Sequence, residues 1–281
     1  LAAVLDAARN PNASIVALAR VVSGDPSFSA MALRVVNTAK YAGNRGPITN
    51  IRMAAMRLGI RTLRNLAVCH AAQSVVSAKQ LKTFNLQKFW EVSLQRAVAA
   101  ERIASRCQGV DPSEAFTGGL LMDLGVLALV LEDPTRSEAF EAWIELDRPD
   151  CMHAEAGAFG LTRADVARQL VQEWKLPDEL GIPVAYALDA AHAPEPLRKL
   201  CHILAAADAV GSVLSRKDTK AALETARAAF PRELGWPDSA VEDVLDTLGD
   251  EVSVAAQMMG FKVGAQPTLD ALLQAATKSL V

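Results

Sequence analysis

Two acidic residues stand alone in apolar surroundings, and their carboxylates are the groups best placed to bind a metal ion. Asp123 lies within GGLLMDLG, residues 118–125, and Asp208 lies within LAAADAVG, residues 204–211. A His-Asp pair on a helix can bind a divalent ion when further His and Asp side chains converge on it. Two carboxylates without imidazoles make a poor transition-metal site. Because buried charges need partners, the sequence favours structural acids, each held by a hydrogen bond at a helix cap or by an arginine.

Other catalytic chemistry has little support in the sequence. There is no GxSxG, no glycine-rich phosphate loop and no HExxH. His202 precedes Asp208 by six residues, a spacing that does not place them on one helical face. The scattered histidines are His70, His153, His192 and His202. We expect no catalytic residue and no cofactor.

The cysteines predict the compartment. Cys69, Cys107, Cys151 and Cys201 are widely spaced and form no CxxC pair. This spacing argues against a zinc site and against a secreted disulfide framework, so we expect reduced thiols in a cytoplasmic protein. No run of about 18 apolar residues is free of charge, so we expect no membrane span.

The net charge of −3 conceals a strong asymmetry. From Pro26 to Trp90 the chain has no Asp or Glu and ten basic side chains. The remaining residues must therefore sum to −13. Two interpretations stay open: the basic segment is a site for an anionic partner, or it attracts the acidic remainder of the same chain.

Nearly every segment has the pattern of an α-helix, and no strand periodicity persists. Caps followed by proline at Asp25-Pro26 and Asp111-Pro112, with Asn85 as a further cap, mark helix starts. The expected helices cover about 12–22, 26–41, 49–58, 62–76, 85–107, a segment from 112 that contains GGLLMDLG, 134–147, 151–158, 162–174, 177–190 and 197–214, with several more in the tail. The fold class is therefore all-α, with two packed helical lobes.

Three regions follow from this division. Residues 1–84 form an N-terminal helical lobe, residues 85–215 a second helical lobe, and residues 216–281 further helices packed on the same domain. The joint near residues 79–85 is polar but short, so we expect the lobes to pack as one unit.

One stretch also suggests DNA binding. In MAAMRLGIRTLRNLA, residues 53–67, Leu58-Gly59-Ile60 could be the turn of a helix-turn-helix, with Arg61 and Arg64 opening the recognition helix. Such turns are common in helical proteins, so ordinary packing is favoured. The acidic remainder of the chain argues against nucleic-acid binding.

An ordered set of motifs resembles the HDOD (HD-related output domain) family. The first half shows Asp25-Pro26, then LRVVNTAKY at 33–41, Ile48, MRLG at 56–59 and LRNL at 63–66. The second half shows Phe89-Trp90 with Ser93, then GGLLMDLG, Gln169-Leu170, WKLP at 174–177 and Ala207-Asp208. The resemblance implies that the second lobe has the helical core of an HD domain.

The HDOD family is related to the HD phosphohydrolases, and this relation implies a degenerate metal site. Hydrolase relatives would place metal-binding histidines at the positions of Val92, Met122, Arg163, Leu188 and Asp189. Asp123 and Asp208 remain from that set. The Met122 thioether suits soft ions only. Arg163 brings a positive charge to a cation site and could instead pair with Asp123 or Asp208.

The resemblance implies a non-catalytic bacterial signal-transduction module that acts through protein contacts. The alternatives are a residual metal-dependent nucleotide phosphohydrolase, or a nucleotide or nucleic-acid binder that uses segment 26–90. A cyclic dinucleotide or another anionic ligand is a further candidate. The expected surface for an anionic partner consists of Arg34, Asn37, Lys40, Tyr41, Arg45 and Arg52. Asn37 has a second, favoured interpretation, in which it bonds a loop backbone.

Overall fold

The structure is a computed structural model, and it describes residues 14–38, 41, 46–75, 84–136, 140, 142–146 and 148–278. The described elements are α2 (Ile15–Ser23), α3 (Pro26–Val36), α5 (Ile51–Val75), α6 (Leu86–Ser105), α7 (Pro112–Leu121), α8 (Leu124–Glu132), η1 (Pro134–Arg136), α10 (Arg148–Phe159), α11 (Arg163–Glu173), α12 (Asp178–Tyr186), η2 (Ala190–His192), α13 (Glu195–Ser215), α14 (Thr219–Ala229), η3 (Phe230–Leu234), α15 (Ala240–Leu245), α16 (Leu248–Met259) and α17 (Leu269–Lys278). The described residues contain no strand, which agrees with the all-α expectation.

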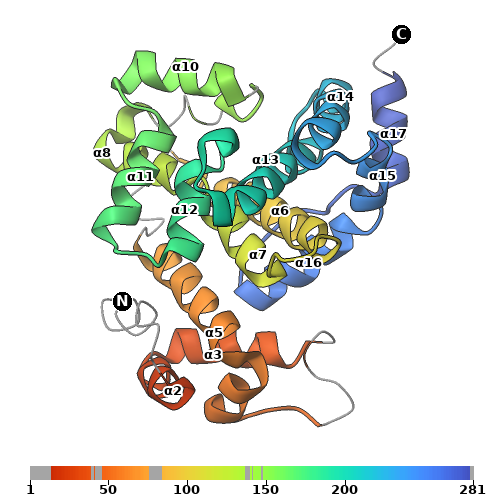
Figure 1. Cartoon of the computed structure of the whole chain (residues 1–281). Helices are drawn as coiled ribbons and strands as arrows, with labels where there is room; N and C mark the ends of the chain where they lie inside the picture. Colours follow the sequence, from red (N-terminus) through yellow and green to blue (C-terminus); the bar gives the residue numbers. More distant parts are fainter. Residues whose placement is uncertain are drawn as a thin grey trace.

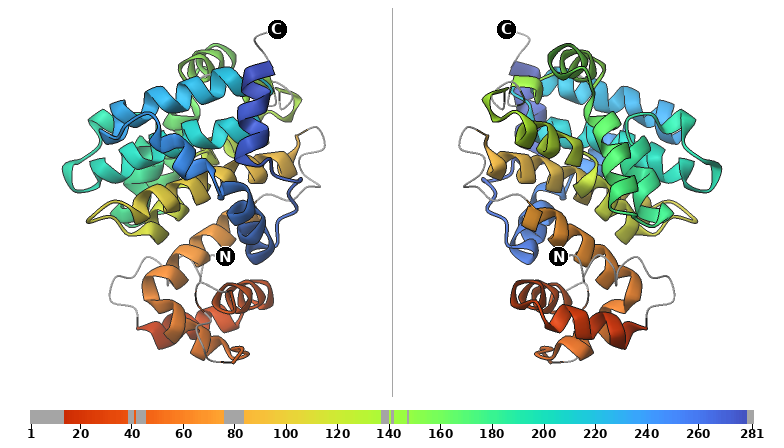
Figure 2. Two further views of the ribbon diagram at one scale, coloured as in Figure 1. Left: turned by 90° about the vertical axis from the view of Figure 1, so that its right-hand side faces the viewer. Right: turned by 90° about the vertical axis from the view of Figure 1, so that its left-hand side faces the viewer.

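Helices α2, α3 and α5 form the N-terminal lobe, at the bottom of Figure 1. The remaining helices form a larger body, which we call the second lobe; α6, α7 and α13 pack together at its centre. Helix α5 runs from the N-terminal lobe to α7, and α16 from the tail packs on both α3 and α6. Figure 2 shows α16 at the boundary between the lobes. The tail therefore takes part in holding the two lobes together.

The predicted caps are present. Asp25 accepts a hydrogen bond from the Phe28 amide at 3.0 Å, Asn85 from the Lys88 amide at 2.9 Å, and Asp111 from the Ser113 amide at 2.8 Å. Each side chain satisfies an amide that the first helical turn leaves without an intrahelical partner. These local bonds explain why the starts of α3, α6 and α7 could be predicted from sequence.

Several expected helices differ from the structure. The one expected over 134–147 begins as the short 3-10 helix η1, and the one expected over 177–190 ends at Tyr186. Two further differences bear on the site. The helix from Pro26 ends at Val36 rather than near Tyr41, because the Asn37 side chain binds the backbone of Ile48 and turns the chain. The segment GGLLMDLG is not one helix: α7 ends at Leu121, and α8 begins at Leu124. Asp123 therefore stands at a helix junction and not within an apolar helix.

Gly59 marks a kink within α5, as the sequence predicts. Its φ of 78° and ψ of 164° are non-helical, in a region that side chains disfavour. The kink lets the first half of α5 stay in the N-terminal lobe while the second half reaches α7.

The most apolar stretch, Pro112–Glu132, meets the length and composition of a membrane span. It comprises α7 and α8, and 78% of its most apolar window is buried inside the protein. Burial of this kind is typical of core helices.

Candidate functional site

Asp123 is the centre of a buried charge network. Its carboxylate is bound by two guanidinium groups: Arg163 Nη1 lies 3.1 Å from Oδ1, and Arg96 Nη1 donates to Oδ2. All three residues are buried. The predicted pairing of Arg163 with Asp123 is therefore confirmed, and Arg96 is a second cation on the same carboxylate.

The network continues on both sides of Asp123. Arg163 also binds Glu155, through its side chain and through its backbone amide at 2.8 Å from Oε2. Arg96 Nε lies 2.8 Å from Asp208 Oδ1. Three carboxylates and two guanidinium groups thus alternate from Glu155 to Asp208, with a formal charge of −1. The alternation lets buried charges compensate one another, as a low-dielectric interior requires.

Glycines bring the network's helices together. A Cβ on Gly125 would lie 2.0 Å from the Arg163 carbonyl oxygen, and one on Gly119 would lie 2.9 Å from Ala97 Cα. A Cβ on Gly211 would meet the Arg96 side chain at 2.8 Å. Positions 119 and 125 belong to GGLLMDLG. The glycines of this motif therefore serve close packing, and this packing places Asp123 beside Arg163.

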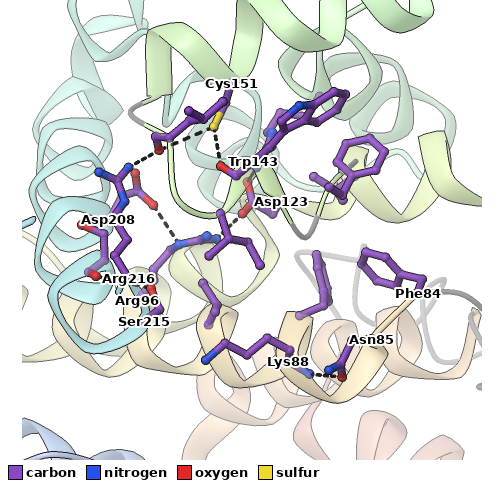
Figure 3. Close-up of a pocket in the computed structure, with 18 residues that line it drawn as sticks. Phe84, Asn85, Lys88, Arg96, Asp123, Trp143, Cys151, Asp208, Ser215 and Arg216 are labelled. Atoms are coloured by element: carbon purple, nitrogen blue, oxygen red, sulfur yellow. Dashed lines mark hydrogen bonds and ion pairs between the residues drawn. The ribbon is translucent and has the colours of Figure 1, made fainter. Parts of the chain in front are cut away.

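A small cavity of about 60 Å³ lies next to the network. Arg96, Asp123 and Asp208 lie on its wall in Figure 3, with Trp143 and Phe84 on other sides. This volume is far below the roughly 300–1,000 Å³ that is typical of small-molecule sites. A nucleotide does not fit into this cavity as the structure shows it.

A divalent cation does not fit the site either. The Asp123 carboxylate already faces two guanidinium charges, and the Asp208 carboxylate faces one. Among the described residues, no three His, Cys, Asp or Glu side chains form a group able to hold a metal ion. The arginines occupy the place in which a cation would balance these acids.

The structure brings some of the implied metal-site positions together. Val92, Asp123, Arg163 and Asp208 all line the small cavity, and Met122 is buried beside Asp123 at the end of α7. Asp189 differs: its half-exposed side chain accepts a hydrogen bond from His192 at 2.6 Å. Neither Leu188 nor Asp189 is among the residues that line the cavity.

Arg96 and Glu155 were not singled out in the sequence. Arg96 lies in the apolar segment VSLQRAVAA of α6, and Glu155 is fully buried in α10. A lone charge in an apolar helix identified Asp123 and Asp208, and the same criterion would have found Arg96. Glu155 has no comparable signal, since AEAGAF surrounds it with small residues.

The expected surface for an anionic partner is only partly available. Arg34 Nε donates to the Met258 carbonyl of α16 at 3.1 Å. Asn37 donates to the Leu33 and Ile48 carbonyls and accepts from the Ile48 amide at 2.7 Å, which confirms its favoured structural role. Tyr41 is half-buried.

Arg52 is exposed on α5. Lys40 and Arg45 lie outside the described residues. Among the described members of the expected group, Arg52 is therefore a basic side chain that is exposed to solvent and does not bind α16.

Part of the basic segment binds the acidic remainder of the chain. Arg61 Nη1 lies 3.5 Å from Asp111 Oδ2 and 3.9 Å from Glu114 Oε1, both on or next to α7. Burial raises the pKa of Glu114, with Asp111 nearby acting in the same direction. Arg61 is one of the two arginines that would open the proposed recognition helix, and in the structure it is directed to acidic residues of the second lobe.

Comparison with known proteins agrees with this architecture. The HDOD domain matches residues 1–190. No curated protein matches. A solved structure of an HDOD domain protein with unknown function from Geobacter sulfurreducens is 22% identical, with a TM-score of 0.64, over 90% of this chain and 88% of that chain.

Two further structures share the fold. A candidate phosphohydrolase from Shewanella amazonensis SB2B is 26% identical, with a TM-score of 0.60, over 99% of this chain and 87% of that chain. A candidate signal transduction protein from Marinobacter aquaeolei VT8 is 22% identical, with a TM-score of 0.67. The match covers 92% of this chain but 58% of that longer protein, and what the two share is the fold.

Proposed function

Since the chain belongs to the HDOD domain family, we propose that it is a non-catalytic signalling module that acts through contacts with other proteins. The observation that carries the proposal is the pair of arginines on Asp123. A metal-dependent hydrolase needs open carboxylates around its ion and room for substrate. Here Arg96 and Arg163 neutralise those carboxylates, and the adjoining cavity is about 60 Å³.

The arginines also give the second lobe a structural centre. Through Glu155, Arg163, Asp123, Arg96 and Asp208, the network joins α10, α11, the α7–α8 junction, α6 and α13. The charge network supports a role in which the lobe is a stable platform for partners.

Metal content and hydrolysis test the non-catalytic part. The chain, purified without chelator, is analysed for transition metals and assayed with bis-p-nitrophenyl phosphate in the presence of Mn²⁺. We expect far less than one metal per chain and no hydrolysis above the metal-only rate. A stoichiometric metal, with turnover that is lost in Asp208→Asn, would instead establish the phosphohydrolase suggested by the Shewanella relative's name.

Charge reversal tests the protein-contact part. Arg52 is exposed at the start of α5, beside the exposed Met53 and Met56. We expect the intact chain to retain an acidic partner protein and Arg52→Glu to release it. Arg20→Glu, an exposed change on α2, is the matched control and should retain the partner. Equal retention by both variants argues against a contact at α5.

A further inference from the structure

A large cavity lies between the two lobes, and none of the five residues of the charge network lines it. Its volume is about 700 Å³. Its walls come from α3 and α5 of the N-terminal lobe and from α6, α7 and α16. These helices surround the boundary between the lobes in Figure 2. The volume lies within the roughly 300–1,000 Å³ typical of small-molecule sites.

The walls of this interlobe cavity are mainly apolar. Leu66 of α5, Val98 of α6 and Phe116 of α7 face it, together with Val254 and Met258 of α16. Val254 is 51% exposed, unusually open for an aliphatic residue that lines a cavity. An occupant with an apolar body would remove this surface from water, which is favourable in proportion to the area covered.

Two polar groups on the wall are incompletely bonded. Asn65 is 5% exposed, and in the part of the chain that the structure describes its side chain makes one hydrogen bond, from Nδ2 to Ser113 Oγ at 3.2 Å. The Asn65 carbonyl oxygen and the Ser113 hydroxyl hydrogen are left for another partner. An amide oxygen and a hydroxyl that are open to the cavity can bond to an occupant in place of water. One acceptor beside one donor fits a neutral hydroxyl or amide.

The charges around the cavity disfavour an anion. Arg102 binds Glu251 and Thr247 and donates to the Asp243 carbonyl at 2.9 Å. Arg106 donates to the same carbonyl at 3.2 Å. Both lining arginines are therefore directed to α15 and α16. The lining has three carboxylates, on Glu101, Asp250 and Glu251, against these two arginines.

We propose that the interlobe cavity binds a small neutral molecule with an apolar body and one hydroxyl or amide group, which bonds to Asn65 and Ser113. Because the walls come from both lobes, occupancy stabilises the arrangement in which they face each other. The site stands independently of the proposed signalling role, since a chain without a protein partner could still bind the molecule.

Two probes of equal chain length test the site: decan-1-ol and decanoate, added below their aggregation limits and followed by calorimetry. We expect saturable one-to-one binding of decan-1-ol and binding of decanoate at least about tenfold weaker, about 1.4 kcal/mol. Asn65→Leu, which keeps the branched shape of the side chain but removes the acceptor, should reduce this preference for the alcohol.

Cavity-filling variants locate the binding. Val254→Trp at the mouth should weaken decan-1-ol binding at least tenfold, and Ala255→Phe, from a buried lining position, should do the same. Val16→Trp on α2, where valine is 44% exposed, is the matched control and should leave binding unchanged. No saturable binding of decan-1-ol, equal binding of both probes, or binding unaffected by both filling variants would overturn the proposal. Circular dichroism of each variant identifies loss of folding.

Discussion

Arg163 and Asp123 form a buried ion pair, with Nη1 3.1 Å from Oδ1, at a position where the family resemblance implies metal chemistry in related hydrolases. Arg163 also holds Glu155, and Asp123 also receives Arg96. Neither residue of the pair is therefore isolated, and a change in one is transmitted to both neighbours.

Asp123→Asn should strongly destabilise the protein. The change leaves two buried guanidinium groups facing a neutral amide, and removing one member of a buried ion pair typically costs about 3–5 kcal/mol. The free energy of unfolding in urea measures the loss. Asp189→Asn is the control, because its pair with His192 is largely exposed and should contribute at most about 1 kcal/mol. Similar small losses in both variants would contradict a structural role for the network.

Gly125→Ala should destabilise the contact between α8 and α11. The new Cβ would lie 2.0 Å from the Arg163 carbonyl oxygen, a backbone atom that cannot move without shifting α11. We expect a loss above about 2 kcal/mol, in the upper range for added core atoms. Gly157→Ala in α10 is the matched control, since its Cβ meets nothing within 4 Å and should stabilise the helix by up to about 1 kcal/mol. Thermal unfolding should show a lower Tm for Gly125→Ala and an equal or higher Tm for Gly157→Ala.

Glu114→Gln should stabilise the protein at neutral pH. Burial raises the pKa of Glu114 above its ordinary value. The native state therefore favours the protonated form of Glu114. Protonated Glu114 adds to the free energy of unfolding at acidic pH, and this contribution is lost as pH rises through the pKa of the folded state. The advantage of Gln over Glu should appear at pH 7 and vanish below about pH 4.5. Urea unfolding at both pH values measures it.

Asp165→Asn supplies a control of opposite sign. Hydrogen bonds from Thr162 lower the pKa of Asp165, so its ionised form stabilises the native state. This contribution is present above the unfolded pKa and lost as pH falls through the folded value. Asp165→Asn should therefore destabilise at pH 7, with the effect fading in acid. If both variants change stability in the same direction at pH 7, the assignment of these two shifts is wrong.

The cysteines should differ in reactivity. Burial raises the pKa of Cys69 and of Cys201 to about 12, so the reactive thiolate is scarce at pH 8. Cys107 is partly exposed, although burial raises its pKa as well. Iodoacetamide at pH 8 should modify Cys107 first in the native protein, as read by peptide mass spectrometry. Unfolding in urea should expose all four cysteines, and early labelling of Cys69 would contradict its burial.

The sequence by itself determined the local structure. Asp25, Asn85 and Asp111 cap helices through hydrogen bonds to amides two or three residues away. Because each cap involves only neighbouring residues, a short stretch of sequence is enough to predict where the helix begins. The kink at Gly59 and the loop bonds of Asn37 are of the same kind. The absence of histidines at the implied ligand positions was also visible without a structure.

The tertiary structure decided which charges meet. Arg96 and Asp123 are 27 residues apart and Arg163 is 40 residues beyond Asp123, so no local pattern relates them. Their meeting depends on close approaches at Gly119, Gly125 and Gly211, which are set by packing between helices. The interlobe cavity likewise exists only because α5, α7 and α16 meet across the lobe boundary. A lone Asp123 predicted that a partner was needed; the packed helices supplied two arginines.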